Sequence, residues 1–224
     1  MSRYPRDELE ESVLLIVNGA ARSGTIWATR LLADSLQVAS RTSYANPPCT
    51  NPEADSAVWH MERPGKFIRR LHYHAHEYPY SPAIPLVSTI RDPRDIVVSQ
   101  ADYYGRNSAD TQAQIWIPRL FAFFREWAES GKITATMRYE KLLKDAKREV
   151  ICVLDELNFP IDEKQIDQAV RDHEFSRSTN YQKGKYGHEG SWKTRIDPSL
   201  AGRIWKRYRD DFYDLGYDQN GFIE

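Results

Sequence analysis

The chain has almost no cysteine, no excess of positive charge and no long apolar run, and each absence excludes a class of protein. Cys49 and Cys152 are its only cysteines, too few for a disulfide framework or a zinc site. A formal net charge of -1 does not provide the basic excess that nucleic-acid binding usually needs. No apolar run approaches the roughly 20 residues of a membrane span, and the polar start MSRYPRDELEES is unlike a signal peptide. We expect a cytoplasmic protein that binds neither nucleic acid nor a membrane.

The composition favours one packed domain. The 224 residues suffice for a substantial core, and no composition shift divides them. Six Trp, thirteen Tyr and eight Phe argue for a packed interior although 28% of the residues are charged. We expect residues 1–224 to form a single domain.

Strand and helix patterns alternate along the chain. The expected strands lie at 13–17, 66–73, 84–90 and 133–139, and the expected helices begin at 25 and cover 94–104, 115–127, 148–157, 163–172 and 200–212. Residues 39–65 hold four prolines and little apolar pattern, which predicts a long surface segment, and the glycine-containing residues 176–191 predict a loop. The alternation predicts an α/β fold with a central, mainly parallel sheet flanked by helices.

The most informative stretch is VLLIVNGAARSGTIWATR at residues 13–30, where an apolar run breaks into a turn of small residues before a helical pattern begins. The turn at 19–24 is tight enough to bring backbone N–H groups against an anion. A helix that begins at Thr25 would add unpaired N–H donors and a partial positive charge, and Arg22 adds a cationic side chain. This layout is typical of a loop that binds phosphate or sulfate.

The same loop lacks the residues of a nucleoside triphosphatase. The pattern GxxxxGK[ST], started at Gly19, places Thr25 and Ile26 where a lysine and a hydroxyl should stand. A triphosphate brought in with Mg²⁺ is therefore disfavoured, and a phosphate balanced by a cationic side chain is favoured. An ordinary strand, turn and helix without a ligand is the alternative that a short motif leaves open.

A second group of polar residues occurs in STIRDPRDIVVSQ at 88–100. Arg91 directly follows a predicted strand, and Ser99 lies about two turns into the next helix. Ligands of open α/β sheets bind at the carboxyl ends of the strands, so these two side chains could clamp a second phosphate. Asp92 and Pro93 predict the N-cap and first residue of that helix. The alternative interpretation is a solvated charge cluster at a helix start.

Four segments together resemble the sulfotransferases, which transfer a sulfuryl group from 3′-phosphoadenosine 5′-phosphosulfate. They are RSGTIW at 22–27, IRDPRDIVVSQADYY at 90–104, YEKL at 139–142 and NYQKGKYGHEGSWKTRI at 180–196. Their order and spacing agree with the family over about residues 13–217. The resemblance implies the P-loop-like sulfotransferase fold, this donor as cofactor, adenosine 3′,5′-bisphosphate as product, and no required metal.

The resemblance also implies roles for particular residues. The first loop would hold the 5′-phosphosulfate, the second motif and the glycine-containing loop would hold the 3′-phosphate, and two side chains would border the adenine beside a tryptophan. The residues for the 5′-phosphosulfate are Arg22, Ser23, Gly24, Thr25 and Ile26. Those for the 3′-phosphate are Arg91, Ser99, Lys183 and Gly184, and those for the adenine are Tyr139, Phe175 and Trp27. The family has Arg where Gln182 stands, so one charged contact is missing here.

Transfer needs a charge stabiliser and a base. Arg22, at a position where cytosolic members usually have Lys, would stabilise charge on the leaving phosphate but would not donate a proton near neutral pH. The base is predicted in RRLHYHAHEYP at 69–79, where His72 best matches the catalytic histidine of cytosolic members. His74 is the second candidate, and Glu62 and Glu77 stay open because other branches use Glu.

Two other functions remain as alternatives. His72, His74 and His76 alternate, so on one strand they could offer three imidazoles to a metal in a metal-dependent hydrolase. A nucleotide-binding module that has lost catalysis would fit the departures at Gln182 and around His72. For the sulfotransferase, the segments expected at the acceptor pocket are rich in Tyr without a basic cluster, which favours a small hydroxyl compound as acceptor. No dimerisation stretch follows Trp192, so the sequence predicts no oligomeric state.

Overall fold

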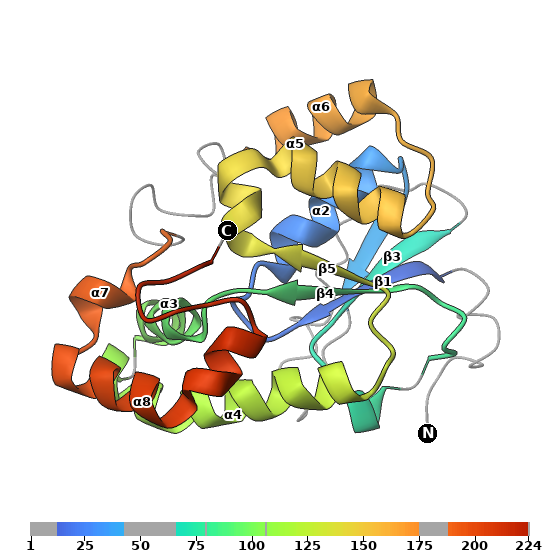
Figure 1. Ribbon diagram of the computed structural model, residues 1–224. Coiled ribbons are helices and arrows are strands. Elements are labelled where there is room, and N and C mark those ends of the chain that lie inside the picture. Colours follow the sequence, from blue (N-terminus) through green and yellow to red (C-terminus); the bar gives the residue numbers. More distant parts are fainter. Residues whose placement is uncertain (1–12, 43–65, 79, 106, 175–187, 224) are drawn as a thin grey trace.

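The computed structural model describes residues 13–42, 66–78, 80–105, 107–174 and 188–223 (Figure 1). Five strands in this part of the chain form one parallel sheet. They are β1 (Val13–Gly19), β2 (Ala39–Thr42), β3 (Phe67–Leu71), β4 (Leu86–Ile90) and β5 (Ala135–Arg138), arranged in the order β2-β3-β1-β4-β5. Gly19, the last residue of β1, lies beside Thr89 of β4. The central position of β1 places its carboxyl end between those of β3 and β4.

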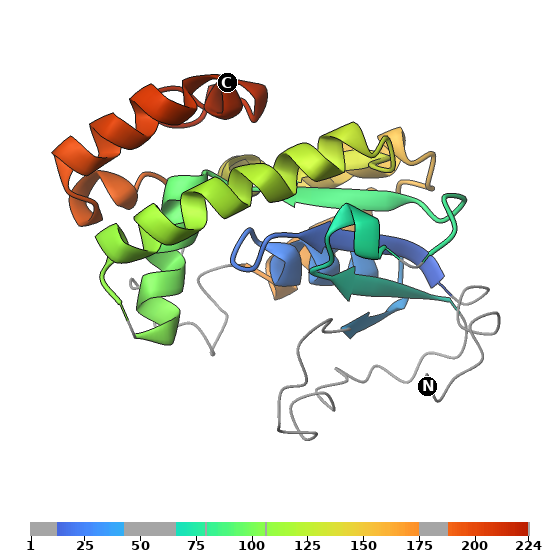
Figure 2. The same cartoon turned by 90° about the horizontal axis from the view of Figure 1, so that it is seen from below.

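Helices cover both faces of the sheet (Figures 1 and 2). One face carries α2 (Thr25–Ser35), α5 (Tyr139–Glu156) and α6 (Glu163–Asp172), and the other carries α4 (Ala109–Glu129) and α8 (Pro198–Asp214). The remaining described helices are α3 (Pro93–Tyr104), the four-residue α7 (Trp192–Arg195) and the 3₁₀ turn η2 (Ala75–Glu77). None of the described helices is long and apolar enough to cross a membrane.

The burial of β1 explains why its sequence is almost continuously apolar. Leu15 and Val17 pack into the core beneath α2 and α5, whereas Val13 and Ile16 pack into the core on the α4 side. A strand covered on both faces by helices needs apolar side chains in both directions. The apolar run therefore encodes a central strand, and its end at Asn18 and Gly19 marks the edge of the sheet where the chain turns.

The predicted α/β class and most of the predicted elements are confirmed. The described strands form a sheet in which all pairs are parallel. The helix at 163–172 matches its predicted bounds, and Pro93 begins α3 as predicted, with Asp92 accepting the N–H of Arg94 at 2.9 Å. Two expectations are wrong. Residues 39–42 form edge strand β2, so the surface segment expected at 39–65 does not begin at 39; residues 43–65 lie outside the described part. Helix α5 begins at Tyr139, nine residues before the predicted start at 148.

A buried polar network ties the C-terminal segment to the end of β4. Arg94 is 1% exposed, pairs with Asp92 at 2.8 Å and donates to the carbonyls of Asp218 and Gln219 at 2.9 and 3.2 Å. Glu140 accepts the N–H of Asp92 and the hydroxyl of Tyr217, each at 2.9 Å. Burial raises the pKa of the Glu140 carboxyl and of the Tyr217 hydroxyl. Because every charge here has a partner, the network holds the chain around Arg91 in one arrangement.

We predict that Gly19→Ala destabilises the protein by about 1 to 3 kcal/mol, the usual cost of overpacking. A β-carbon at this position would lie 2.1 Å from Oγ1 of Thr89 and 2.8 Å from its carbonyl oxygen, and the backbone oxygen cannot rotate away. Chemical denaturation measures the change. Gly202→Ala, with open space on α8, is the control and should be neutral or gain up to about 1 kcal/mol. Equal stability of the two variants would contradict this packing.

Candidate active site

The first loop turns tightly because its residues pack against the end of β4. The Ser23 hydroxyl donates to the carbonyl of Ala20 at 2.7 Å and lies 2.7 Å from the Thr89 hydroxyl, and Ser23 is fully buried. Arg22 has a positive φ of 76° and Gly24 one of 96°. Positive φ is uncommon for residues other than glycine and marks a constrained backbone at Arg22. The loop therefore presents Arg22 at the sheet edge in a fixed conformation.

Helix α2 begins directly after this loop without a side-chain cap. Its N-cap is Gly24, in the left-handed conformation, and the first turn contains no acidic residue. Backbone N–H groups of a first helical turn lack intrahelical partners, and the helix dipole makes this end positive. Ser23, Gly24, Thr25 and Ile26 thus lie where the sequence predicted them, at a helix start suited to an anion.

Arg22, Arg91 and Ser99 come together as the two motifs predicted. The Nε of Arg22 donates to the Ser99 hydroxyl at 3.1 Å, which links the first loop to α3. The Nη1 of Arg91 donates to the carbonyl oxygen of Arg22 at 3.2 Å. The Arg22 guanidinium also lies 4.6 Å from the ring centre of Tyr103 on α3. These contacts join the two motifs into one cationic site.

Arg91 is a buried cation with unused hydrogen-bonding capacity. It is 3% exposed, and it forms no ion pair with a carboxylate in the described part of the chain. Its Nε is buried and has no hydrogen-bond partner among the described residues. A buried charge normally needs a counter-charge and filled hydrogen bonds. Arg91 is therefore a candidate contact for an anionic ligand.

Aromatic rings form the wall next to Arg91. Tyr139, at the start of α5, lies 4.3 Å from the Arg91 guanidinium and packs edge to face on Trp27 of α2 at 5.9 Å. A β-carbon on Gly24 would approach the Tyr139 ring to 2.7 Å, so only glycine fits there. The structure brings both predicted adenine neighbours in the described part, Trp27 and Tyr139, to the same side of the loop.

His72 lies at the end of β3, against the first loop. Its Nδ1 lies 2.7 Å from the carbonyl oxygen of Gly19. A carbonyl only accepts, so Nδ1 carries the proton and the lone pair of the neutral ring is on Nε2. Burial, with a smaller contribution from the nearby Arg70, lowers the pKa of His72 to about 4 against the opposing effect of the Gly19 carbonyl. The imidazole is therefore neutral at pH 7 and able to accept a proton.

Asn18 is a positioning residue that the sequence analysis missed. It is fully buried at the end of β1, donates to the Tyr73 carbonyl at 3.4 Å and accepts the Tyr73 N–H at 3.1 Å. These bonds fix the chain immediately after His72. The signal was visible as the single polar residue in the apolar run VLLIVNG, directly before the turn.

His74 and His76 belong to a different cluster. Strand β3 ends at Leu71, so the predicted strand face shared by His72, His74 and His76 does not exist, and the three-histidine metal site is wrong. Both Nδ1 atoms lie against Glu126 of α4, at 2.8 Å for His74 and 2.6 Å for His76. His74 contacts this carboxylate, whereas His72 contacts Gly19. Glu77 is exposed and caps the η2 turn through the His74 N–H.

Four predicted cofactor or base residues lie outside the described residues, namely Glu62, Phe175, Lys183 and Gly184, as does Gln182. The chain that follows them is anchored beside the second motif. Asp95 accepts the N–H of Gly190 at 2.7 Å and the N–H of Trp192 at 3.1 Å. Burial, with a contribution from Asp92, raises the pKa of the Asp95 carboxyl to about 7. Asp95 thereby connects the C-terminal motif to α3.

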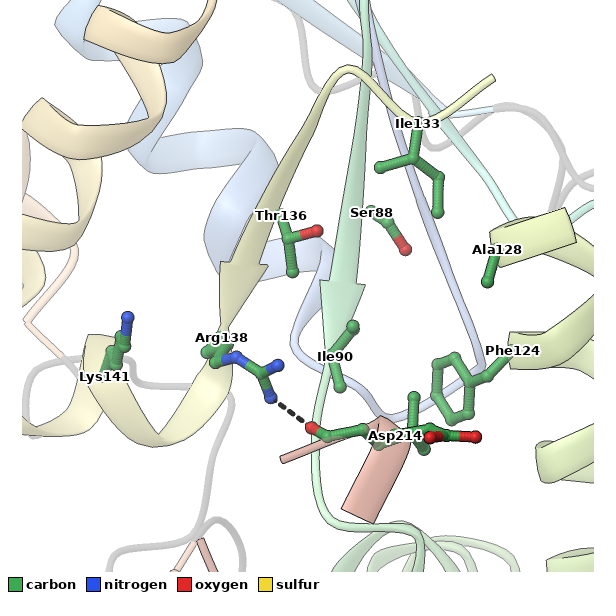
Figure 3. Close-up of a pocket in the computed structure, with 10 residues that line it drawn as sticks. Ser88, Ile90, Phe124, Ala128, Ile133, Thr136, Arg138, Lys141 and Asp214 are labelled. Atoms are coloured by element: carbon green, nitrogen blue, oxygen red, sulfur yellow. Dashed lines mark hydrogen bonds between the residues drawn. The ribbon is translucent and has the colours of Figure 1, made fainter. Parts of the chain in front are cut away.

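A pocket of about 340 Å³ lies elsewhere, between β4, β5, α4 and the end of α8 (Figure 3). Ser88, Thr136 and Phe124 line it, and Arg138 donates to the Leu215 carbonyl at its rim, at 2.5 Å. None of the residues that the sequence predicted for the active site lines this pocket.

Solved structures share this fold. Retinol dehydratase in complex with androsterone and the inactive cofactor PAP matches with a TM-score of 0.68 and 16% identity, over 92% of this chain and 84% of that chain. Retinol dehydratase with retinol and PAP matches with a TM-score of 0.68 and 17% identity over the same shares. Mouse sulfotransferase SULT7A1 complexed with PAP matches with a TM-score of 0.67 and 14% identity, over 93% of this chain and 88% of that chain. No family model and no curated protein sequence matches the chain. The predicted sulfotransferase fold is confirmed.

We predict that His72 makes the fold less stable in acid. Its pKa is about 4 in the folded protein against an ordinary value of 6.5, so between these values the unfolded chain binds the proton more readily. Stability is therefore lost as the pH falls from about 6.5 to about 4, by up to about 1 kcal/mol per pH unit. His72→Asn keeps a donor for the Gly19 carbonyl but does not titrate, so its free energy of unfolding should decline less steeply. Parallel pH profiles from denaturation would contradict the assignment.

Proposed function

We propose that the protein is a sulfotransferase that moves the sulfuryl group of 3′-phosphoadenosine 5′-phosphosulfate to the hydroxyl of a small molecule. The observation that carries the proposal is Arg91, a buried cation whose Nε has no partner among the described residues and which contacts the loop at an uncapped helix start. A doubly phosphorylated nucleotide supplies one anionic group for Arg91 and another for the start of α2. The presence of PAP in the similar structures supports this choice over other nucleotides.

The described residues divide between the two anionic groups of the donor. The start of α2 and Arg22 would bind the 5′-phosphosulfate, while Arg91 and Ser99 would bind the 3′-phosphate. Trp27 and Tyr139 would border the adenine, together with Phe175. Lys183 and Gly184 would add contacts to the 3′-phosphate, and Asp95 would keep their segment near α3 through Gly190 and Trp192.

His72 would act as the general base. Its Nε2 takes the proton of the acceptor hydroxyl while the acceptor oxygen forms a bond to sulfur and the bond from sulfur to the phosphate oxygen breaks. Arg22 and the N–H groups of the loop stabilise the charge that develops on the leaving adenosine 3′,5′-bisphosphate. The Gly19 carbonyl holds the Nδ1 proton and so keeps Nε2 available. Anionic phosphates near the ring would raise its pKa from about 4 and so assist proton uptake.

Tyrosine side chains after His72 and at the end of α3 suit an apolar acceptor. Tyr78 packs on Tyr80 and on Trp127, with ring centres 5.6 and 5.4 Å apart, and Tyr103 and Tyr104 are exposed at the end of α3. Two of the similar structures hold androsterone and retinol. A small hydrophobic alcohol or phenol is therefore the acceptor class we infer.

The first test is calorimetric titration with adenosine 3′,5′-bisphosphate. We predict binding that depends on the 3′-phosphate, so adenosine 5′-monophosphate and ATP with Mg²⁺ should bind far more weakly. Arg91→Met should raise the dissociation constant at least about 30-fold, because it removes a buried charge partner of the phosphate. Arg209→Ala, which removes an exposed arginine of α8, should bind like the wild type. Preference for ATP, or no binding, would exclude the proposed cofactor.

The second test separates catalysis from binding. We predict that His72→Ala binds adenosine 3′,5′-bisphosphate normally but transfers sulfate about 10² to 10⁴ times more slowly, the usual contribution of a general base. Transfer is measured with labelled donor and a panel of phenols and alcohols. His173→Ala is the control and should retain full activity, because His173 lies at the end of α6 and pairs with Asp34 at the opposite end of α2 from the binding loop. Activity in His72→Ala would move the base to His74, and nucleotide binding without transfer to any acceptor would favour an inactive module.

A further inference from the structure

Two histidines and a glutamate converge outside the proposed active site. His74 is the N-cap of the η2 turn and His76 lies within it, while Glu126 comes from α4, 50 residues after His76. The His74 Nδ1 lies 2.8 Å from one Glu126 oxygen and the His76 Nδ1 lies 2.6 Å from the other. One ligand atom from each side chain lies within 4.8 Å of the others, so a single ion placed among them could contact all three.

Two hydrogen bonds hold the backbone around this cluster without using the three side chains, in addition to the bond from the His76 N–H to Glu126. The Trp127 indole donates to the Tyr73 carbonyl at 2.9 Å, and the Lys132 ammonium donates to the Ala75 carbonyl at 2.9 Å. Both donors come from α4 or the residues after it, so η2 is fixed to this helix on either side of His74. A site whose ligands are positioned before binding loses less entropy when an ion enters.

The ligand chemistry selects the kind of ion. Imidazole nitrogen and one carboxylate suit zinc and its divalent transition-metal neighbours, whereas Mg²⁺ and Ca²⁺ prefer oxygen ligands alone. The side chains of His74 and His76 are 46% and 70% exposed, so an ion can reach them from solvent. Three protein ligands leave at least one coordination position for water.

We propose that His74, His76 and Glu126 form a binding site for one divalent transition-metal ion, with Zn²⁺ as the representative ligand. The ion would replace the present contacts between each Nδ1 and Glu126, with each imidazole carrying its proton on Nε2 so that the Nδ1 lone pair faces the ion. It would cross-link η2 to α4 next to the segment that follows His72. The site is separate from the proposed catalytic residues, because the His72 ring is turned to the Gly19 carbonyl, and the proposal does not depend on the sulfotransferase activity.

Titration of the untagged, reduced protein with Zn²⁺ in a non-chelating buffer tests the site. The expected result is one equivalent bound with a micromolar or lower dissociation constant and no comparable binding of Mg²⁺. His76→Ala and Glu126→Gln should each weaken binding at least about 10-fold. His173→Ala is the matched control, since that histidine contacts a single carboxylate, Asp34, at 2.6 Å. It should leave binding unchanged.

A second readout does not depend on affinity alone. Co²⁺ bound by two imidazoles and a carboxylate should give visible absorption bands that are absent from His76→Ala, and Zn²⁺ should raise the melting temperature of the wild type but not of that variant. Cys152 is a free, exposed cysteine and a competing ligand. Binding that disappears in Cys152→Ser but survives in His76→Ala would overturn the proposal, as would the absence of saturable binding to the folded wild type.

Discussion

The close approach of the end of β1 to the end of β4 is the constraint on which the rest of the site depends. At Gly19 the two strands are so close that a β-carbon would overlap Thr89. The chain must then leave the sheet in a tight turn, which Ser23 closes by bonding back to Ala20 and lying against Thr89. Because the turn is that short, α2 begins at the sheet edge, with its positive end next to Arg91. One steric requirement thus sets the position of the helix start and of the cation.

Two neighbouring arginines show how the protein divides buried charge between stability and binding. Arg94 donates hydrogen bonds to Asp92 and to the carbonyls of Asp218 and Gln219, so its charge is paired within the fold. Arg91, three residues earlier and equally buried, keeps an Nε without a partner in the described part of the chain. No described carboxylate forms an ion pair with Arg91, whose charge acts on Asp95 without direct contact. That difference is why we propose Arg91 as the anion contact, whereas Arg94 is a structural residue.

The sequence predicted the features that local chemistry determines. An apolar run that ends in a glycine turn, and Asp92 followed by Pro93, each specify their structure within a few residues. Strand β2 was missed because ASRT has no apolar alternation and pairs only along one edge, with β3. The start of α5 was missed because the helix is interrupted at Asp145, with φ of -154° and ψ of 85°, which breaks the apolar period before residue 148. The partner of His74 and His76 could not be read locally, since Glu126 lies on another element.

His72 and His74 differ because the chain between them is held from two sides. Asn18 at the end of β1 bonds the Tyr73 backbone in both directions, and Trp127 of α4 bonds the same carbonyl. Because Tyr73 is fixed between the sheet edge and α4, His72 contacts the Gly19 carbonyl and His74 contacts Glu126. The first environment is buried and keeps the ring neutral, while the second is exposed and supplies a carboxylate. Two histidines separated by one residue therefore have different chemistry, which the spacing HxH alone does not encode.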